Sequence, residues 1–284
     1  MTAQPPQTPA QPSYWNQTGG QAWIDLQGLM DRLNQPICDA VIAAGFPGAG
    51  GAGGAVLDIG CGAGATTLEM ARRVGPEGRS VGVDVSAPLL EAARASAQAQ
   101  GITNARFLEG DAQTYDLGTA AYDAAISRFG VMFFADFDAA FTNLRRALKP
   151  DGKLAFACWR SPVDNPLAGT PALAAAPFLP PIPEPDLHAP GRWAFADPDR
   201  VRGILARTGW RDIEIAPYDV PTPISYDDLL TLSLRLGALS APLQQADDAT
   251  QEKVRAAVAE RLRAYETDGM VAMRAACWLV TARA

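Results

Sequence analysis

The stretch LDIGCGAGATTLEM, residues 57–70, carries the strongest signal in this chain of 284 residues. An apolar strand pattern contains Asp58, three glycines follow at alternate positions, and a helix-like run begins at Ala65. A glycine-rich turn between a strand and a helix lets the backbone approach a bound nucleotide closely. The stretch therefore predicts a cofactor site, and the open question is whether that cofactor is negative or positive at its centre.

Strand and helix patterns alternate from residue 55 onwards. Short apolar runs predict strands at residues 55–59, 79–85, 105–110, 122–127, 153–159, 211–220 and 273–283. Spacings of three and four, with cap signals, predict helices at 14–44, 65–74, 86–101, 136–148, 197–208, 226–239 and 249–265, and a turn at 149–152. The pattern predicts an α/β fold with a doubly wound, mostly parallel seven-stranded sheet, an N-terminal helical segment and a helical, proline-rich cap.

The composition divides the chain into five regions. We expect a disordered tail at 1–13, a helical lead-in with a glycine-rich linker at 14–54, a cofactor-binding core at 55–160, a proline-rich insertion on the substrate side at 161–196, and the last part of the core with inserted helices at 197–284. The prolines of residues 161–190 argue against a regular helix or a central strand there. That segment is interpreted either as a loop over the sheet edge or as a wall of the substrate pocket.

Charge and hydropathy exclude several classes of protein. The net charge is -7 and the basic pairs Arg72-Arg73 and Arg145-Arg146 are short, so we expect no nucleic-acid partner. No apolar run reaches the length of a membrane span, and the first residues have no signal-peptide pattern. Integral membrane association is therefore not expected.

Cysteine and histidine usage argues against a metal site. The four cysteines, at positions 38, 61, 158 and 277, form no CxxC pair, and His188 is the only histidine. Reduced core cysteines are typical of a cytoplasmic protein, which is the location we expect.

Three carboxylates follow the glycine signal at strand ends. Asp58, Asp84 and Asp111 fall near the carboxyl ends of three successive predicted strands, which is where doubly wound sheets bind ligands. Asp84 is placed to accept hydrogen bonds from two ribose hydroxyls, a role that suits NAD and S-adenosylmethionine alike. The glycines satisfy GxGxG, but Ala65 also completes the looser dinucleotide pattern GxGxxA. The glycines alone do not choose the cofactor.

Asp58 distinguishes the two cofactors by charge. A pyrophosphate needs backbone N–H groups and positive potential, so a neighbouring carboxylate repels it. S-adenosylmethionine carries a sulfonium and an ammonium instead, and a pair at about 4–5 Å in an effective dielectric of about 20 attracts by a few kcal/mol before desolvation. The sequence therefore favours the positive cofactor.

Five motifs in the same order resemble the class I S-adenosylmethionine-dependent methyltransferases. They are LDIGCGAGATT (57–67), GVDVS (82–86), FLEGDAQ (107–113), YDAAISRFGVMFF (122–134) and LRRALKPDGKLAFACW (144–159). The likeness covers residues 55–159 and is greatest to the bacterial group related to ubiquinone/menaquinone C-methyltransferases. YWNQTGGQAW (14–23) also resembles the lead-in helix of one subgroup.

The resemblance implies a set of cofactor-binding residues. The methionine part would lie against Asp58, Gly60, Cys61, Gly62 and Gly64, the ribose and adenine against Asp84, Val85, Gly110, Asp111 and Ala112, and the methyl group beside Ser127 and Arg128, with Tyr14, Trp15 and Trp23 closing over the cofactor. Core packing of an amphipathic helix explains Trp23 equally well. The segment SRFG (127–130) departs from the [DN]PP[YF] motif of enzymes that methylate adenine or amide nitrogens, which argues against those substrates.

Candidate acceptor-side residues have competing interpretations. An apolar acceptor pocket would use Phe129, Met132, Phe133, Phe178, Trp193 and Phe195, although aromatics at such spacings also build cores. Two residues are catalytic candidates: Arg128 could stabilise negative charge or pair with a local aspartate, and His188 could act as a base or be an incidental loop residue.

These observations predict methyl transfer to a small, apolar or aromatic acceptor, with S-adenosylhomocysteine as product, no metal, and a monomer or homodimer. Two alternatives stay open, an NAD(P)-dependent oxidoreductase and a non-catalytic cofactor-binding module of the same fold.

Overall fold

The computed structural model describes residues 15–16, 18–46 and 53–284. The predicted tail at 1–13, Tyr14 and part of the glycine-rich linker lie outside the described residues.

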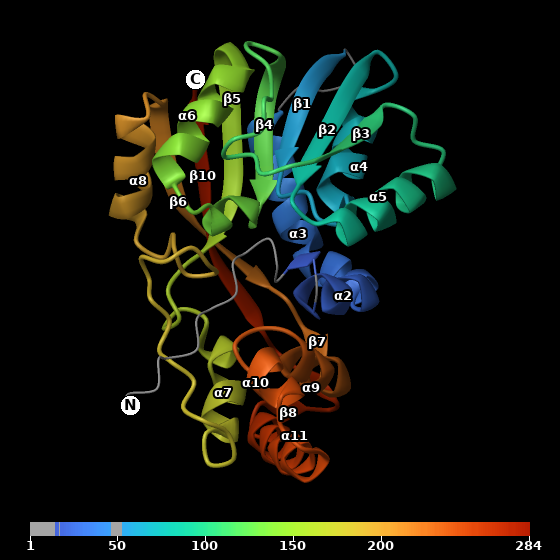
Figure 1. Ribbon diagram of the computed structural model, residues 1–284, viewed down its shortest axis with the longest axis vertical. Helices are drawn as coiled ribbons and strands as arrows, with labels where there is room; N and C mark the ends of the chain where they lie inside the picture. Colours follow the sequence, from blue (N-terminus) through green and yellow to red (C-terminus); the bar gives the residue numbers. More distant parts are fainter. Residues whose placement is uncertain (1–14, 17, 47–52) are drawn as a thin grey trace, which may run out of the picture.

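A seven-stranded sheet forms the centre of the protein (Figure 1). Its strands are β1 (Gly54–Ile59), β2 (Gly78–Asp84), β3 (Ala105–Glu109), β4 (Tyr122–Arg128), β5 (Leu148–Trp159), β6 (Arg211–Pro221) and β10 (Arg274–Arg283), in the order β3-β2-β1-β4-β5-β10-β6. β10 runs in the opposite direction to the other six strands of this sheet. The doubly wound, mostly parallel sheet predicted from the sequence is confirmed.

Helices cover both faces of the sheet (Figure 1). They are α3 (Gln27–Gly45), α4 (Ala65–Val74), α5 (Ala87–Ala99), α6 (Phe137–Ala147) and α8 (Pro198–Arg207). A further helix, α2 (Thr18–Asp25), lies beyond the end of the sheet and packs on α3 and α5 (Figure 1). The caps form as the sequence indicates: Ser86 and Asp136 accept N–H groups in the first turns of α5 and α6. Gly101, at φ 65°, ends α5 in the left-handed conformation that favours glycine.

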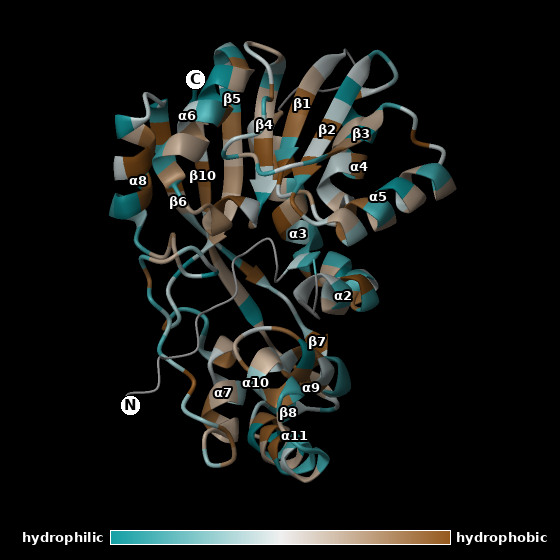
Figure 2. Cartoon of the chain, in the orientation of Figure 1, coloured by the Kyte–Doolittle hydropathy of each residue, from teal (hydrophilic) through white to brown (hydrophobic). Residues whose placement is uncertain are grey.

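The apolar sides of these helices meet the strands in one large core (Figure 2). Phe141, Phe156 and Phe195 are fully buried and their ring centroids lie about 6 Å apart. Burying each such ring contributes about 1.5–3 kcal/mol. This core fixes the strand ends from which the site is built.

A second hydrophobic cluster holds a helical cap beyond the carboxyl ends of β1–β5 (Figure 1). The cap contains α7 (Thr170–Ala175), α9 (Tyr226–Arg235), α10 (Ser240–Gln244), α11 (Asp248–Arg263) and a small sheet of β7 (Ile224–Ser225), β9 (Met270–Val271) and β8 (Glu266–Thr267). Its centre is formed by Val254, Val258 and Leu262 of α11.

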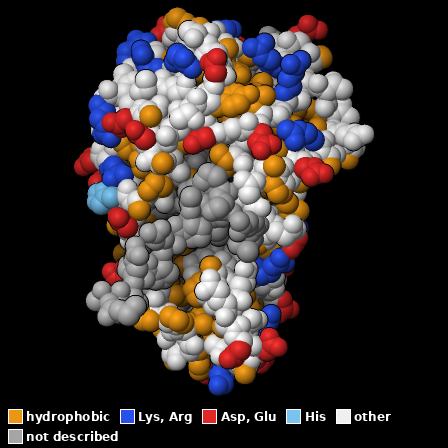
Figure 3. All heavy atoms as spheres, in the orientation of Figure 1, with side chains coloured by type: hydrophobic (Ala, Val, Ile, Leu, Met, Phe, Trp, Pro, Cys, Tyr) orange, Lys and Arg blue, Asp and Glu red, His pale blue; other side chains and the backbone are white. Residues whose placement is uncertain are grey.

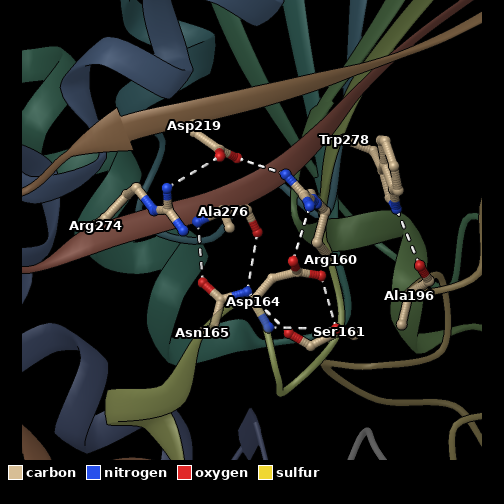
Figure 4. Close-up of polar contacts among 9 residues, drawn as sticks. All are labelled: Arg160, Ser161, Asp164, Asn165, Ala196, Asp219, Arg274, Ala276 and Trp278. Atoms are coloured by element: carbon tan, nitrogen blue, oxygen red, sulfur yellow. Dashed lines mark hydrogen bonds and ion pairs between the residues drawn. The ribbon is translucent and has the colours of Figure 1, made fainter.

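Polar contacts fix the chain where it leaves the sheet for the cap (Figure 4). Arg160 pairs with Asp164 and Asp219 at 2.8 and 2.9 Å. The amide of Asn165 donates to the Ala276 carbonyl and accepts from the Ala276 N–H, at 3.0 and 2.9 Å. Asn165 is buried, and its two hydrogen bonds pair with β10 at Ala276, just beyond the point where β5 ends.

Four details differ from the sequence-based expectation. The proline-rich segment does contain a helix, α7, because Pro171 occupies its first turn, where its missing N–H is not needed. The predicted turn at 149–152 lies within β5, as an irregularity between the pairs Tyr122–Leu148 and Ala124–Lys153. The helix expected at 14–44 is broken at Leu26, between α2 and α3. The helix expected at 226–239 ends at Arg235.

Candidate active site

The parallel strands β1–β4 end side by side at Ile59, Asp84, Glu109 and Arg128, a row called here the carboxyl edge. The glycine loop, residues 60–64, begins there. The N–H groups of Gly60 and Cys61 both donate to the Val83 carbonyl, at 2.9 and 3.2 Å. Gly64, at φ 86°, then turns the chain directly into α4. These two hydrogen bonds fasten the loop to β2 at the carboxyl edge.

Gly62 is the residue of this loop that has free space beside it. Its φ is 53°, and a Cβ built there would meet no atom within 4 Å. A Cβ on Gly64 would instead lie 2.8 Å from the Ala93 side chain. The backbone of Gly62 is therefore open on the side where a side chain would stand. The loop therefore fits the cofactor cradle predicted from the sequence.

Asp84, the last residue of β2, is held in one orientation. Its Oδ2 accepts from the Gly62 N–H at 2.8 Å and its Oδ1 accepts from the Ser86 N–H at 2.9 Å. Burial raises the pKa of Asp84, while these backbone hydrogen bonds act in the opposite direction. Each carboxylate oxygen keeps a second lone pair. Asp84 can therefore still accept from a ribose hydroxyl without moving.

Asp58 lies within β1 and is only 1% exposed. Its Oδ2 accepts from the Thr67 hydroxyl at 2.6 Å, and its buried Oδ1 has no hydrogen-bond partner among the described residues. Burial raises the pKa of Asp58 to about 7, although the Thr67 hydrogen bond and the charge of Arg128 act in the opposite direction. A positive charge near the loop would favour the ionised form.

Asp58 should make folding stability fall as the pH rises. The pKa of an aspartate in an unfolded chain is about 3.9, so between about pH 4 and pH 7 the folded protein binds more protons than the unfolded one. Asp58→Asn, whose side chain cannot ionise, should therefore lose less free energy of unfolding over this pH range than the unmodified protein does. Urea unfolding at pH 5, 6, 7 and 8 measures the difference between the two proteins.

The control is Asp116→Asn, since the Asp116 side chain is 85% exposed. The stability of Asp116→Asn should run parallel to that of the unmodified protein across this pH range. If Asp58→Asn also runs parallel, Asp58 does not carry the raised pKa.

The residues that the sequence predicts for the adenine follow β3. Asp111 accepts from the Gln113 N–H at 2.9 Å, and the Gly110 N–H donates to the Asp84 carbonyl at 2.9 Å. Ala112 is buried, and its carbonyl accepts from the Asn143 side chain. These contacts hold Asp111 next to the end of β2, two residues beyond the end of β3.

Residues before α2 cross the carboxyl edge. The Ser86 hydroxyl donates to the Trp15 carbonyl at 2.8 Å, and the Asn16 side chain bonds the Val85 carbonyl and the Ala87 N–H, both at 3.0 Å. The Trp15 ring makes edge-on contacts with Trp23 of α2 and with Phe133. Trp15 therefore spans from the end of β2 to the segment after β4.

The residues that end β4 are anchored to the glycine loop and to α3. The Ser127 hydroxyl donates to the Ile59 carbonyl at 2.7 Å and accepts from the Gly130 N–H at 3.1 Å. The Arg128 guanidinium is 9% exposed and pairs with Asp31 of α3 at 3.5 Å. The local ion pair considered from the sequence is thus present.

The predicted acceptor-side residues separate into two groups. Phe129 stacks on Trp159 with ring centroids 4.5 Å apart, and Phe133 contacts Trp15. Met132 and Phe195 are 1% and 0% exposed and belong to the core, the interpretation weighed against a pocket role.

Phe178 and His188 lie elsewhere. Phe178 is 40% exposed and follows α7 in the cap. His188 is exposed and contacts Arg200 of α8 through its ring and its carbonyl. Trp193 lies beside Arg192, whose guanidinium carbon is 5.1 Å from the Trp193 ring.

Sequence reasoning missed several residues that shape the site. They are Thr67, Asn16, Asp31, Trp159 and Arg192, of which only Asp31 and Arg192 lie outside the motifs quoted above. Only Thr67 had a usable signal, since it lies nine residues after Asp58 in the first turn of α4.

Two further features were sought in the described residues, a metal site and a membrane span. In residues 15–16, 18–46 and 53–284 no three His, Cys, Asp or Glu side chains gather as a metal site would require. No helix of the described chain combines the length and apolar character that crossing a membrane requires. On the face shown in Figure 3, acidic and basic side chains lie intermixed.

Comparison with known proteins identifies the core. The family described as "Methyltransferase domain" matches residues 56–152. Aklanonic acid methyltransferase of Streptomyces sp. (strain C5) is 34% identical over 139 residues, which span 49% of this chain and 61% of that protein. Demethylmenaquinone methyltransferase of Thermus thermophilus is 38% identical over 99 residues, 35% of this chain and 44% of that protein. Residues 56–152 are thus similar to a methyltransferase domain. The resemblance found in the sequence is confirmed.

The methyltransferase fold extends over most of the chain. Phosphoethanolamine N-methyltransferase 2 of Haemonchus contortus, solved in complex with S-adenosyl-L-methionine, aligns with a TM-score of 0.56 and 16% identity, covering 95% of this chain and 59% of that one. At this identity the likeness shows the fold alone. The chain spans about half the length of the curated relatives it matches, from 35% to 61%. The oxidoreductase and binding-module alternatives are not favoured by these matches.

Proposed function

We propose that this protein transfers a methyl group from S-adenosylmethionine to a small apolar or aromatic acceptor. The observation that carries the proposal is the charge of the carboxyl edge: Asp58 precedes the glycine loop, Asp84 accepts from its Gly62 N–H, Asp111 follows β3 beside the end of β2, and the cation Arg128 is paired with Asp31. Such a site suits a cationic cofactor better than a pyrophosphate. The relatives' names, which include aklanonic acid and demethylmenaquinone, support a small-molecule acceptor.

The chain's own residues would bind and orient the two reactants. Gly62 lets the cofactor approach the backbone, Asp84 accepts from its ribose, and Asp111 lies where the adenine amino group would donate. Bound S-adenosylmethionine would supply the methyl carbon. The acceptor's lone pair would form a bond to that carbon while the carbon–sulfur bond breaks, and the electron pair of the broken bond would stay on sulfur. The products would be the methylated acceptor, S-adenosylhomocysteine and a proton. Alignment and exclusion of water are the main contributions expected of the protein.

The acceptor would lie between the carboxyl edge and the cap. Trp15 and Phe133, both half-buried, supply aromatic surface there, whereas Phe129 is buried in the core beneath Trp159. Arg128, fixed by Asp31, remains the candidate for stabilising negative charge, whereas the contact of His188 with Arg200 leaves it out of the proposal. The division into a core at 55–160, a substrate-side insertion at 161–196 and a C-terminal part at 197–284 belongs to the same proposal.

The protein's surroundings complete the proposal. All four cysteines are buried and free, which fits a reducing compartment such as the cytoplasm. We retain the expectation of a monomer or homodimer that needs no metal.

Isothermal titration of the purified protein with S-adenosylhomocysteine and, separately, with NADPH tests the cofactor. We expect saturable binding of S-adenosylhomocysteine and none of NADPH. Absence of S-adenosylhomocysteine binding at high micromolar concentration, by protein that is folded, would contradict the proposal. Cofactor binding without transfer of labelled methyl groups to any of a panel of hydroxylated aromatics would favour the binding module.

A further inference from the structure

Residues 191–196 are fastened at both ends, to the segment after β4 and to β10. The Gly191 N–H donates to the Met132 carbonyl, 2.9 Å away, just after β4. The Trp278 indole N–H of β10 donates to the Ala196 carbonyl at 3.0 Å (Figure 4). The segment therefore has a fixed position beside the ends of β4 and β5, next to the proposed acceptor space.

Arg192, in this segment, lies against aromatic rings. Its guanidinium carbon is 4.3 Å from the ring centroid of Trp159 and 5.1 Å from that of Trp193. Trp159 in turn stacks on Phe129, with an interplanar angle of 3°. Contact with aromatic faces orients a guanidinium and leaves the N–H donors at its rim available.

Arg192 has no anionic partner among the described residues. Other arginines near the carboxyl edge do: Arg128 pairs with Asp31, and Arg160 pairs with Asp164 and Asp219. The chain has 31 acidic and 24 basic residues, so carboxylates are not scarce. An oriented cation left unpaired beside aromatic surface is suited to bind an anion from outside the protein.

The solvent access of Arg192 agrees with a ligand contact. The residue is exposed, yet the surrounding protein lowers the pKa of its guanidinium to about 10. At neutral pH the group remains a cation.

We infer that Arg192 is a specificity residue that binds a carboxylate carried by an aromatic acceptor. The inference rests on the proposed function, since it takes the space next to the carboxyl edge as the acceptor site. Guanidinium and carboxylate match in a planar, two-bond geometry, and the half-buried ring of Trp193 beside Arg192 provides aromatic surface for the acceptor's apolar part. The acceptor class is therefore an aromatic acid.

Two probes that differ only in charge test this inference. 1-Hydroxy-2-naphthoate and 1-hydroxy-2-naphthamide share ring and hydroxyl, and isothermal titration measures both against protein saturated with S-adenosylhomocysteine. We expect the unmodified protein to prefer the carboxylate by about 10-fold, which is toward the lower end for hydrogen bonds to charged groups because Arg192 is exposed. Arg192→Gln should lose that preference and bind the amide as before.

The matched control is Arg106→Gln, on β3, because Arg106 is also exposed and unpaired in the described chain. It should keep the preference. Equal affinity of the unmodified protein for both probes, failure to bind either, or an equal loss of both in Arg192→Gln would overturn the inference. Titration with S-adenosylhomocysteine alone separates the two proposals. Normal binding of S-adenosylhomocysteine without a preference for the carboxylate refutes only the role of Arg192. A preference for the carboxylate in protein that does not bind S-adenosylhomocysteine refutes the cofactor assignment.

Discussion

Replacing Asp84 by alanine is expected to weaken S-adenosylhomocysteine binding by about 10- to 150-fold, which corresponds to about 1.5–3 kcal/mol for hydrogen bonds to a charged group. The substitution removes the proposed acceptor of the ribose hydroxyls. It also leaves the N–H groups of Gly62 and Ser86 without the oxygens that now accept from them at 2.8 and 2.9 Å. The glycine loop would lose its fixed position at the end of β2.

The control is Asp116→Ala, which removes the same charge from an exposed side chain that pairs with Arg146 at 3.2 Å. Surface pairs of this kind contribute little, so cofactor affinity should not change. Isothermal titration of both variants, with circular dichroism to establish folding, makes the comparison. Unchanged affinity in folded Asp84→Ala would mean that the ribose does not bind at the end of β2.

The fold was predictable because its signals are local. Each of the seven strands has a short apolar run next to a turn or cap residue, and the caps Ser86 and Asp136 form as expected. The predictions of secondary structure are wrong where contacts between distant parts of the chain determine the conformation. The start of β5 is a strand only because Leu148 pairs with Tyr122, and the two-residue strands of the cap have no pattern of their own.

The site was predictable to the extent that motifs encode it. The glycine loop and the carboxylates Asp84 and Asp111 can be found by spacing, since strand ends in a parallel sheet are neighbours. Asn16 and Arg192 could not be found this way, because they reach the carboxyl edge from segments whose position depends on tertiary packing. The burial of Asp58, which raises its pKa, likewise depends on the folded core.

Gly130→Ala is expected to lower the free energy of unfolding by about 2–3 kcal/mol, the upper range for overpacking. A Cβ at Gly130 would lie 2.4 Å from the Ile59 carbonyl oxygen and 2.7 Å from the Gly60 Cα. These are backbone atoms, and the Ser127 hydroxyl also holds the Ile59 carbonyl. The first residue of the glycine loop would have to move, so cofactor affinity should fall together with stability.

The control for Gly130→Ala is Gly203→Ala in α8, where a Cβ would meet only the flexible end of Arg207, at 3.6 Å. Alanine is a better helix former than glycine, so this variant should be as stable as the unmodified protein or more stable by up to about 1 kcal/mol. Urea unfolding compares the three proteins at one pH. Equal stability of Gly130→Ala and the unmodified protein would show that β1 and the segment after β4 do not approach this closely. If Gly130→Ala loses stability but keeps full cofactor affinity, the contact between Gly60 and Gly130 contributes to folding and does not determine the shape of the cofactor cradle.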